Sequence, residues 1–130
     1  GGNECTSEAA QRLLNEAARY LGTPYVWGGY SPSGFDCSGF VSYCLTNSGV
    51  RNTGRLTAQG LYDICTPVSQ SEAQPGDLIF FTGTYDAGVP VTHIGIYVGN
   101  GQMIHCGHPV QYTSINSPYW QSHFYGFGRW

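Results

Sequence analysis

The chain has 130 residues, a formal net charge of -3 at pH 7 and only 10% charged residues, against 15% aromatic residues and 19 glycines. This length fits a single domain, which we expect to span residues 1–130, with residues 1–5 as a flexible or cloning-derived extension. Because the sequence has no run of Lys and Arg and no apolar stretch of about 20 residues, it lacks the signatures of a nucleic-acid binder and of a membrane span.

The first predicted element is an amphipathic helix over residues 7–21. Thr6 or Ser7 can cap its start, and Gly22 ends it. Its apolar face repeats with the helical period: Ala10, Leu13, Leu14, Ala17, Ala18 and Leu21. The aromatic and glycine-rich residues 25–34 that follow are expected to form a loop whose backbone passes close to other groups.

A second helix is predicted to begin after Asp36, which is a suitable N-cap, and to end before Gly49. One face of it is apolar: Phe40, Val41, Cys44 and Leu45. Cys37 therefore lies in the first turn, where unpaired backbone N–H groups and the helix dipole favour a thiolate over a thiol. This position is typical of a nucleophilic cysteine, and the alternative is a buried structural thiol.

The other four cysteines match none of the usual zinc spacings, and their pairing is left open. They are Cys5, Cys44, Cys65 and Cys106. Cys37 and Cys44 are separated by about 10 Å of helical rise, which is too far for a disulfide.

The second half of the chain is predicted to be mostly strands. The expected elements are a helix near 58–64, a turn at 75–77, a buried strand over 78–81, a surface loop over 82–91, strands over 93–98 and 102–106, and a last strand near 125–129. A helical first half followed by consecutive strands predicts an α+β domain. Trp120, Trp130 and the C-terminal tyrosines are expected to be core and surface aromatics.

A nucleophilic cysteine needs a base, and His93 and His105 lie on two strands joined by a short turn. If Asn100-Gly101 alone forms the turn, His105 faces away from His93. If residues 99–101 form a three-residue loop, Ile96 pairs with Ile104, and the two histidines become diagonal neighbours on one face. We predict the second register, because it also keeps the isoleucines of both strands in the core.

Gly95 lies between the two histidines and would leave room for both imidazoles. The sequence therefore predicts Cys37, His93 and His105 as nucleophile, base and orienting residue. A metal site made of His93, His105, Cys106 and His108 is disfavoured, because neighbouring residues on a strand point to opposite faces. No metal or other cofactor is expected.

Four motifs, in this order, resemble the NlpC/P60 cysteine peptidases of bacterial cell walls from about residue 20 to 130. They are YVWGG at 25–29, DCSGF at 36–40, PGDLIFF at 75–81, and HIGIYVG at 93–99 followed by MIH at 103–105. The resemblance implies a papain-like α+β fold with N-terminal helices on an antiparallel sheet. It also implies hydrolysis of peptidoglycan stem peptides, typically between D-glutamate and the following diaminopimelate or lysine, by an extracellular or wall-located monomer without cofactor that is part of a longer protein.

The same resemblance implies roles for individual residues. Cys37 corresponds to the nucleophile, His93 to the base and His105 to the third residue, while Tyr25 would assist the oxyanion hole. The implied substrate-binding residues are Trp27, Asp36, Ser38, Arg55 and Thr57, with Asp36 as the anchor for a free amine in some members. The long 82–91 connection and Cys106-Gly107-His108 depart from the family pattern.

Two other functions remain open at this point. A non-catalytic module would hold wall peptides in an aromatic groove of Tyr25, Trp27 and Tyr30, although such a module needs no cysteine or histidine triad. An amidase or acyltransferase would use the same triad for a different outcome, and product analysis would distinguish it from an endopeptidase.

Overall fold

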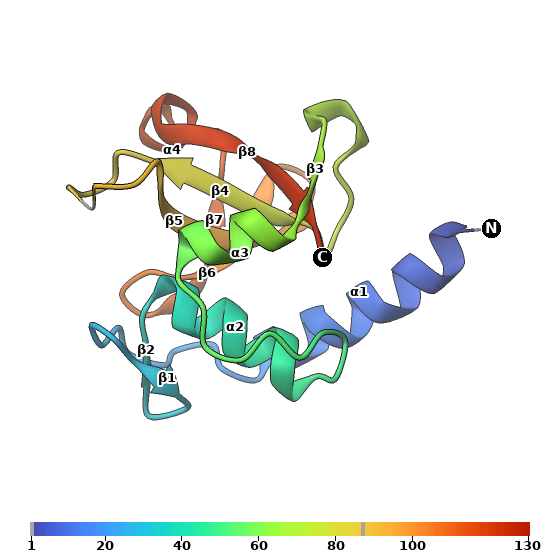
Figure 1. The fold of residues 1–130 in the computed structure, drawn as a ribbon, viewed down its shortest axis with the longest axis horizontal. Coiled ribbons are helices and arrows are strands. Elements are labelled where there is room, and N and C mark those ends of the chain that lie inside the picture. The colour runs from blue at the N-terminus through green and yellow to red at the C-terminus, as the bar shows by residue number, and fades with distance from the viewer. Residues whose placement is uncertain (1, 87) are drawn as a thin grey trace.

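A computed structural model describes the backbone of residues 2–86 and 88–130, and side chains from residue 8 onward apart from residue 87. The chain is an α+β domain in which helices α1 and α2 pack below a strongly curved sheet (Figure 1). The elements are α1 (Gly2–Ala18), β1 (Tyr30–Ser31), β2 (Gly34–Phe35), α2 (Cys37–Asn47), α3 (Ala58–Ile64), β3 (Thr66–Val68), a 3-10 helix η1 (Gln70–Glu72), β4 (Leu78–Thr82), β5 (Val91–Gly99), β6 (Gln102–Cys106), β7 (Val110–Ser114), α4 (Pro118–His123) and β8 (Phe124–Arg129).

The main sheet has the strand order β3-β8-β4-β5-β6-β7 and every neighbouring pair is antiparallel. The predicted α+β class is therefore confirmed. Within the described residues 2–86 and 88–130, no helix is long and apolar enough to cross a membrane. Cys37, Cys44, Cys65 and Cys106 are all unpaired thiols.

α1 differs from the predicted helix over residues 7–21 at both ends. Its backbone is already helical at Gly2, so the predicted start near Ser7 is wrong. It ends at Ala18, because the N–H groups of residues 19–21 bond to carbonyls three residues earlier instead of four. The Gly22 N–H then donates to the Val110 carbonyl, which draws the chain towards the sheet. Leu21, which was assigned to the apolar face, is consequently 44% exposed.

α2 forms as predicted and is the helix that carries the first candidate residue. Asp36 caps it by accepting a hydrogen bond from the Gly39 N–H at 2.7 Å, and Gly49 adopts a positive φ of 80° just beyond its end. Buried residues occupy almost every side of its first turns: Cys37, Ser38, Gly39, Phe40, Val41, Ser42, Cys44 and Leu45. This helix is therefore a rigid platform enclosed by α1, the β1–β2 hairpin and the sheet.

The β5–β6 hairpin contains both registers considered from the sequence. Gly99 pairs with Gln102 at the turn, but a register shift between Tyr97 and Gly99 changes the pairing farther along the strands. Ile96 then pairs with Ile104, as predicted. The shift acts as a β-bulge, which restores the register that buries the isoleucines and keeps the histidines on one face.

Several elements were not predicted. Residues 25–34, expected to be a loop, include β1 and lead into a short hairpin in which Tyr30 pairs with Phe35. The strands β3 and β7 and the helix α4 were also missed, because each is short and is stabilised by distant partners. The loop after β4 is confined to residues 83–90, since Thr82 and Val91 belong to strands.

Candidate active site

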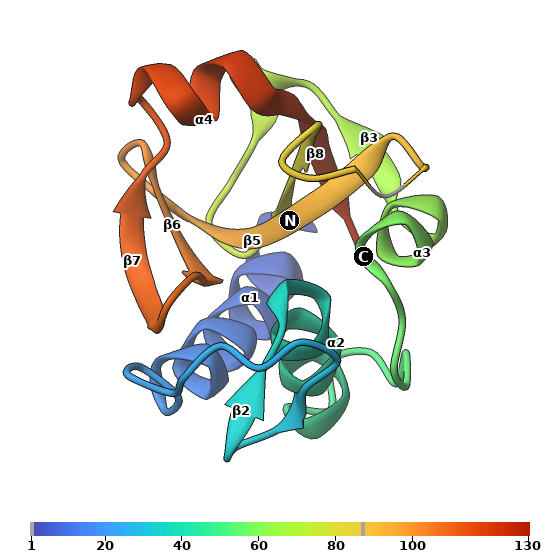
Figure 2. The ribbon, with the colours of Figure 1, turned by 90° about the vertical axis from the view of Figure 1, so that its left-hand side faces the viewer.

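Cys37 is the first residue of α2, and its thiol contacts Thr92 near the start of β5. Figure 2 shows α2 below β5. The side chain is only 8% exposed, and its thiol donates to the Thr92 carbonyl with a sulfur-to-oxygen distance of 3.9 Å. The backbone N–H groups of Ser38 and Ile94 also face the sulfur. The nucleophile candidate is therefore held between the helix N-terminus and the strand that carries His93.

Burial of Cys37 opposes the thiolate that the start of the helix favours. Burial, together with the nearby Asp36 carboxylate, raises the pKa of the Cys37 thiol to about 11 and outweighs the stabilising N–H groups. Burial and the neighbouring His105 lower the pKa of His93 to about 3. At neutral pH the cysteine is therefore a thiol and His93 an uncharged imidazole.

The two histidines are brought together as predicted. His93 Nε2 and His105 Nδ1 are 2.9 Å apart, and the rings are nearly perpendicular. A Cβ atom at Gly95 would lie 3.1 Å from His105 Cβ and 2.8 Å from the Met103 sulfur, so a larger residue there would crowd the side chains of β6, including that of His105. His105 is 4% exposed, so water does not compete for this hydrogen bond.

Two residues of this histidine site were missed from the sequence. Trp120 stacks on His93 with ring centroids 5.2 Å apart and meets His105 edge-on at 5.4 Å, so it is not merely a core aromatic. Thr113 Oγ1 lies 2.8 Å from His105 Nε2. Only the pairing of β7 with β6 brings Thr113 to the histidines, and β7 itself had no clear sequence signal.

Cys37 and His93 are neighbours through the backbone and not through a direct hydrogen bond. The thiol donates to the carbonyl of Thr92, and the N–H of Ile94 faces the sulfur. The residues on either side of His93 therefore contact the sulfur, while the His93 ring points toward His105 and Trp120.

Three of the five residues expected to bind substrate, Asp36, Ser38 and Arg55, form one polar network. The Asp36 carboxylate accepts hydrogen bonds from Arg55 Nη2 at 2.6 Å and from the Gly28 N–H at 3.0 Å. Arg55 Nη1 also donates to Ser38 Oγ at 2.9 Å. Asp36 is thus already paired with a guanidinium and does not offer an isolated carboxylate to a substrate amine. Thr57 instead caps α3 by accepting from the Gly60 N–H at 3.0 Å.

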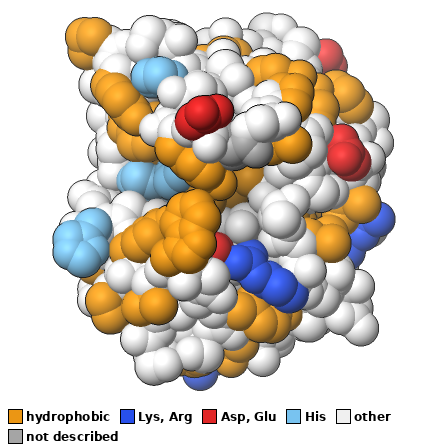
Figure 3. All heavy atoms as spheres, turned by 60° about the vertical axis from the view of Figure 1, so that its left-hand side comes forward, with side chains coloured by type: hydrophobic (Ala, Val, Ile, Leu, Met, Phe, Trp, Pro, Cys, Tyr) orange, Lys and Arg blue, Asp and Glu red, His pale blue; other side chains and the backbone are white. Residues whose placement is uncertain are grey.

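A cleft of about 580 Å³ runs past Cys37 and this network. Its lining includes Tyr25, Trp27, Gly28, Asp36, Cys37, Ser38, Arg55, Thr57, Ala58, Gln59, Gly60, Asp63, Tyr85, Val89, Val91 and Thr92. His93 and His105 are not part of this lining. The face drawn in Figure 3 shows exposed hydrophobic side chains gathered beside histidine and basic side chains.

Aromatic rings from both sides of the cleft meet at its rim. The rings of Trp27 and Tyr85 form an edge-to-face contact with centroids 5.5 Å apart, although the two residues remain 72% and 48% exposed. Tyr85 belongs to the 83–90 loop, whose base is fixed by two hydrogen bonds. The Thr84 N–H donates to Thr92 Oγ1 at 3.0 Å, and the hydroxyls of the two threonines are 2.6 Å apart. The rim is therefore anchored beside the strand that contacts Cys37.

Tyr25 lies on the cleft wall near Cys37. Burial, with a smaller effect of Cys37, raises the pKa of Tyr25 to about 12, so its hydroxyl keeps its proton at neutral pH and can donate a hydrogen bond.

The metal-site alternative does not fit the geometry. Cys106 donates its thiol to the Phe35 carbonyl at 3.1 Å, on the opposite face of β6 from the His105 ring. Within the described part of the chain, no group of three or more His, Cys, Asp or Glu side chains is placed to hold a metal ion.

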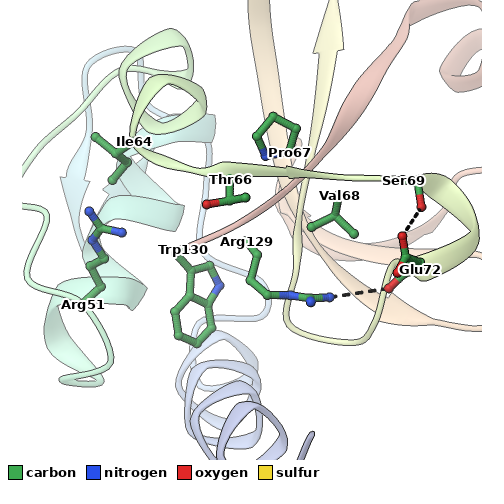
Figure 4. Close-up of a pocket in the computed structure, with 9 residues that line it drawn as sticks. All are labelled: Arg51, Ile64, Thr66, Pro67, Val68, Ser69, Glu72, Arg129 and Trp130. Atoms are coloured by element: carbon green, nitrogen blue, oxygen red, sulfur yellow. Dashed lines mark hydrogen bonds between the residues drawn. The ribbon is translucent and has the colours of Figure 1, made fainter. Parts of the chain in front are cut away.

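A second cavity of about 540 Å³ lies at the β3 edge of the sheet, and Figure 4 shows Arg129 and Trp130 between Arg51 and Glu72. Arg129 pairs there with Asp77 at 2.7 Å. This cavity has no cysteine or histidine in its lining, so it holds no counterpart of the Cys37 and His93 pair.

Comparison with known proteins identifies the family. A family model described as the NlpC/P60 family matches residues 22–129. The chain is 44% identical over 121 residues to the bifunctional muramidase/DL-endopeptidase CwlT of Bacillus subtilis (strain 168), covering 92% of this chain and 36% of that protein. It is 39% identical over 132 residues to the murein DD-endopeptidase MepH of Escherichia coli (strain K12), covering 94% of this chain and 46% of that protein.

Among solved structures, a lipoprotein-like NLP/P60 family protein from Staphylococcus aureus subsp. aureus Mu50 has a TM-score of 0.88 and 44% sequence identity, covering 94% of this chain and 41% of that one. The chain therefore spans less than half the length of each of these three relatives. The matched range and the shared fold confirm the predicted resemblance, and the chain belongs to the NlpC/P60 family.

Proposed function

We propose that this chain is a cysteine endopeptidase that cuts the stem peptides of peptidoglycan. The observation that carries the proposal is that His93 lies on the strand whose backbone contacts the Cys37 thiol and is hydrogen-bonded to His105. The names of the two relatives described above, a DL-endopeptidase and a DD-endopeptidase, support this activity.

The proposed reaction is acyl transfer through Cys37. Because Nε2 of His93 is engaged with His105, Nδ1 is the nitrogen available to take the thiol proton. When substrate enters, the thiol turns from the Thr92 carbonyl, His93 removes its proton, and the sulfur attacks the peptide carbonyl. His93 then gives this proton to the leaving amine. In the second half, His93 takes a proton from water, hydroxide attacks the thioester, and the proton returns to the sulfur as the acid product leaves.

Because Cys37 and His93 are both uncharged before the reaction, the free energy needed to form the thiolate and the imidazolium is part of the activation barrier. The Ser38 N–H at the helix start and the Tyr25 hydroxyl are the proposed donors to the oxyanion, for which one good donor contributes about 3 kcal/mol in other hydrolases. Trp120 stacks on the imidazole and keeps it in place as its charge changes.

We infer that the bond cut is the one between D-glutamate and the following diamino acid. We also infer that the protein acts on the wall outside the cell, as a monomer and as part of a longer protein. The cleft suits a polar stem peptide, because the paired side chains of Arg55 and Asp36 line it beside Ser38. The two relatives carry names for different bonds, so the cleavage position is the first quantity to measure.

Incubation of purified peptidoglycan with the protein and with Cys37→Ala, followed by mass spectrometry, tests the proposal. The wild type is expected to release fragments with new D-glutamyl and diamino-acid termini, and the variant none. Release by both proteins would exclude Cys37 as the nucleophile. If neither releases fragments but both pull down with the wall, the binding-module alternative replaces the peptidase, while transfer of the acyl group to an added amine would indicate an acyltransferase.

Tyr85→Ala is expected to raise KM for a stem peptide about 3- to 10-fold with kcat nearly unchanged, since the variant loses one aromatic wall of the cleft and no reacting group. Steady-state kinetics checks this, with Tyr112→Ala, another exposed tyrosine outside the cleft lining, as the control. An unchanged KM in Tyr85→Ala would remove the loop from substrate binding.

A further inference from the structure

A continuous chain of hydrogen bonds runs from His93 to the outer strand of the sheet. His93 Nε2 lies 2.9 Å from His105 Nδ1, and His105 Nε2 lies 2.8 Å from Thr113 Oγ1. A neutral imidazole has one N–H donor and one acceptor nitrogen. The protons of this chain can therefore be arranged in only two consistent ways.

In the first arrangement, Thr113 Oγ1 accepts from His105 Nε2–H, and His105 Nδ1 accepts from His93 Nε2–H. The Nδ1 nitrogen of His93 then carries a lone pair and can act as a base. In the second arrangement, the Thr113 hydroxyl donates and every proton is reversed. His93 Nδ1 then carries a hydrogen and cannot accept the proton of the thiol.

The surroundings leave Thr113 as the group that selects between them. The indole of Trp120 packs on both rings, and its only polar group is a donor, so it cannot accept from His105. On the other side lies Gly107, where even a Cβ atom would be 3.4 Å from His105 Nε2. Among the described residues, Thr113 is the only hydrogen-bond partner of that nitrogen.

We propose that Thr113 is a positioning residue that accepts the His105 proton and thereby holds His93 in the tautomer that is a base. This inference rests on the proposed role of His93. Without the Thr113 oxygen, the first arrangement leaves a buried His105 Nε2–H with no acceptor, and the second leaves a buried His105 Nε2 lone pair with no donor. A buried N–H without an acceptor is the less tolerated of the two. The equilibrium then moves to the unproductive tautomer.

Three substitutions test the direction of the hydrogen bond. Thr113→Val keeps the side-chain shape without the oxygen and is expected to lower kcat about 10- to 100-fold with KM unchanged. Thr113→Ser is expected to keep most of the activity. Thr113→Asp supplies an ionised side chain that can only accept, and it is expected to recover kcat relative to Thr113→Val. Tyr112→Val, which changes an exposed neighbour on β7, is the control for the strand.

The ¹⁵N chemical shifts of His93 report its tautomer without any turnover. The wild type, Thr113→Ser and Thr113→Asp are expected to show Nε2–H, and Thr113→Val a shift towards Nδ1–H. An unchanged tautomer in Thr113→Val, or loss of activity in a folded Thr113→Asp with Thr113→Ser active, would overturn the inference. If Thr113→Val does not fold, the Ser and Asp pair still decides the direction.

The two readouts also separate this inference from the proposed function. A wild type without peptidase activity would defeat the proposed function and leave the tautomer test intact. An active wild type with an unchanged tautomer in Thr113→Val would defeat only the role of Thr113.

Discussion

Replacing His93 with Gln is expected to lower kcat on a stem-peptide substrate by about a thousandfold, with little change in KM. The amide can still bond to His105, but it cannot take the proton of Cys37. KM is expected to hold because His93 lies outside the lining of the substrate cleft. Initial rates over a range of substrate concentrations, with the product termini identified, measure both quantities.

The matched control for this substitution is His108→Gln, because His108 is an exposed histidine near the same hairpin. Its kinetics are expected to equal those of the wild type. If His93→Gln keeps more than a tenth of the wild-type kcat while remaining folded, then another group removes the thiol proton and the proposed mechanism is wrong.

The second large effect is the pH dependence of Cys37 alkylation by iodoacetamide. A thiol with a pKa of about 11 is ionised to roughly one part in ten thousand at pH 7, and this fraction grows tenfold per pH unit. Because the pKa of His93 is about 3, its ring stays neutral above about pH 4 and adds no further step. The alkylation rate is thus expected to rise about a thousandfold from pH 7 to pH 10.

Peptide mapping by mass spectrometry must follow Cys37 separately, since Cys65 is also an accessible thiol whose pKa is raised to about 11 by burial. Cys37→Ala provides the background. A rate that is constant between pH 5 and pH 8 would instead indicate a thiolate–imidazolium pair in the free protein.

Local patterns in the sequence were sufficient for the parts of the site that one element or one hairpin determines. The N-cap at Asp36 placed Cys37 at the start of a helix, because side-chain capping depends on residues three positions apart. The pairing of His93 with His105 followed from the need to bury Ile96 and Ile104 on one side of a hairpin.

The remaining parts of the site depend on contacts between distant segments, which no local pattern encodes. Trp120 reaches His93 from a short helix near the end of the chain, and Thr113 reaches His105 from a strand that was not predicted. The effect of burial on the Cys37 thiol was missed for a related reason. The helix dipole can be inferred from position in the helix, but the depth of burial depends on the packing of the sheet against α2.

The hydrogen bonds between Thr84 and Thr92 have a consequence for how far this chain tolerates change at the cleft rim. They hold the base of the 83–90 loop one residue before His93, so a change of conformation in the loop beyond Thr84 is not expected to move His93. Surface loops tolerate insertions and substitutions far better than the strands that they connect. Substitutions beyond Thr84 are therefore expected to reshape the rim around Tyr85 while His93 and His105 keep their positions.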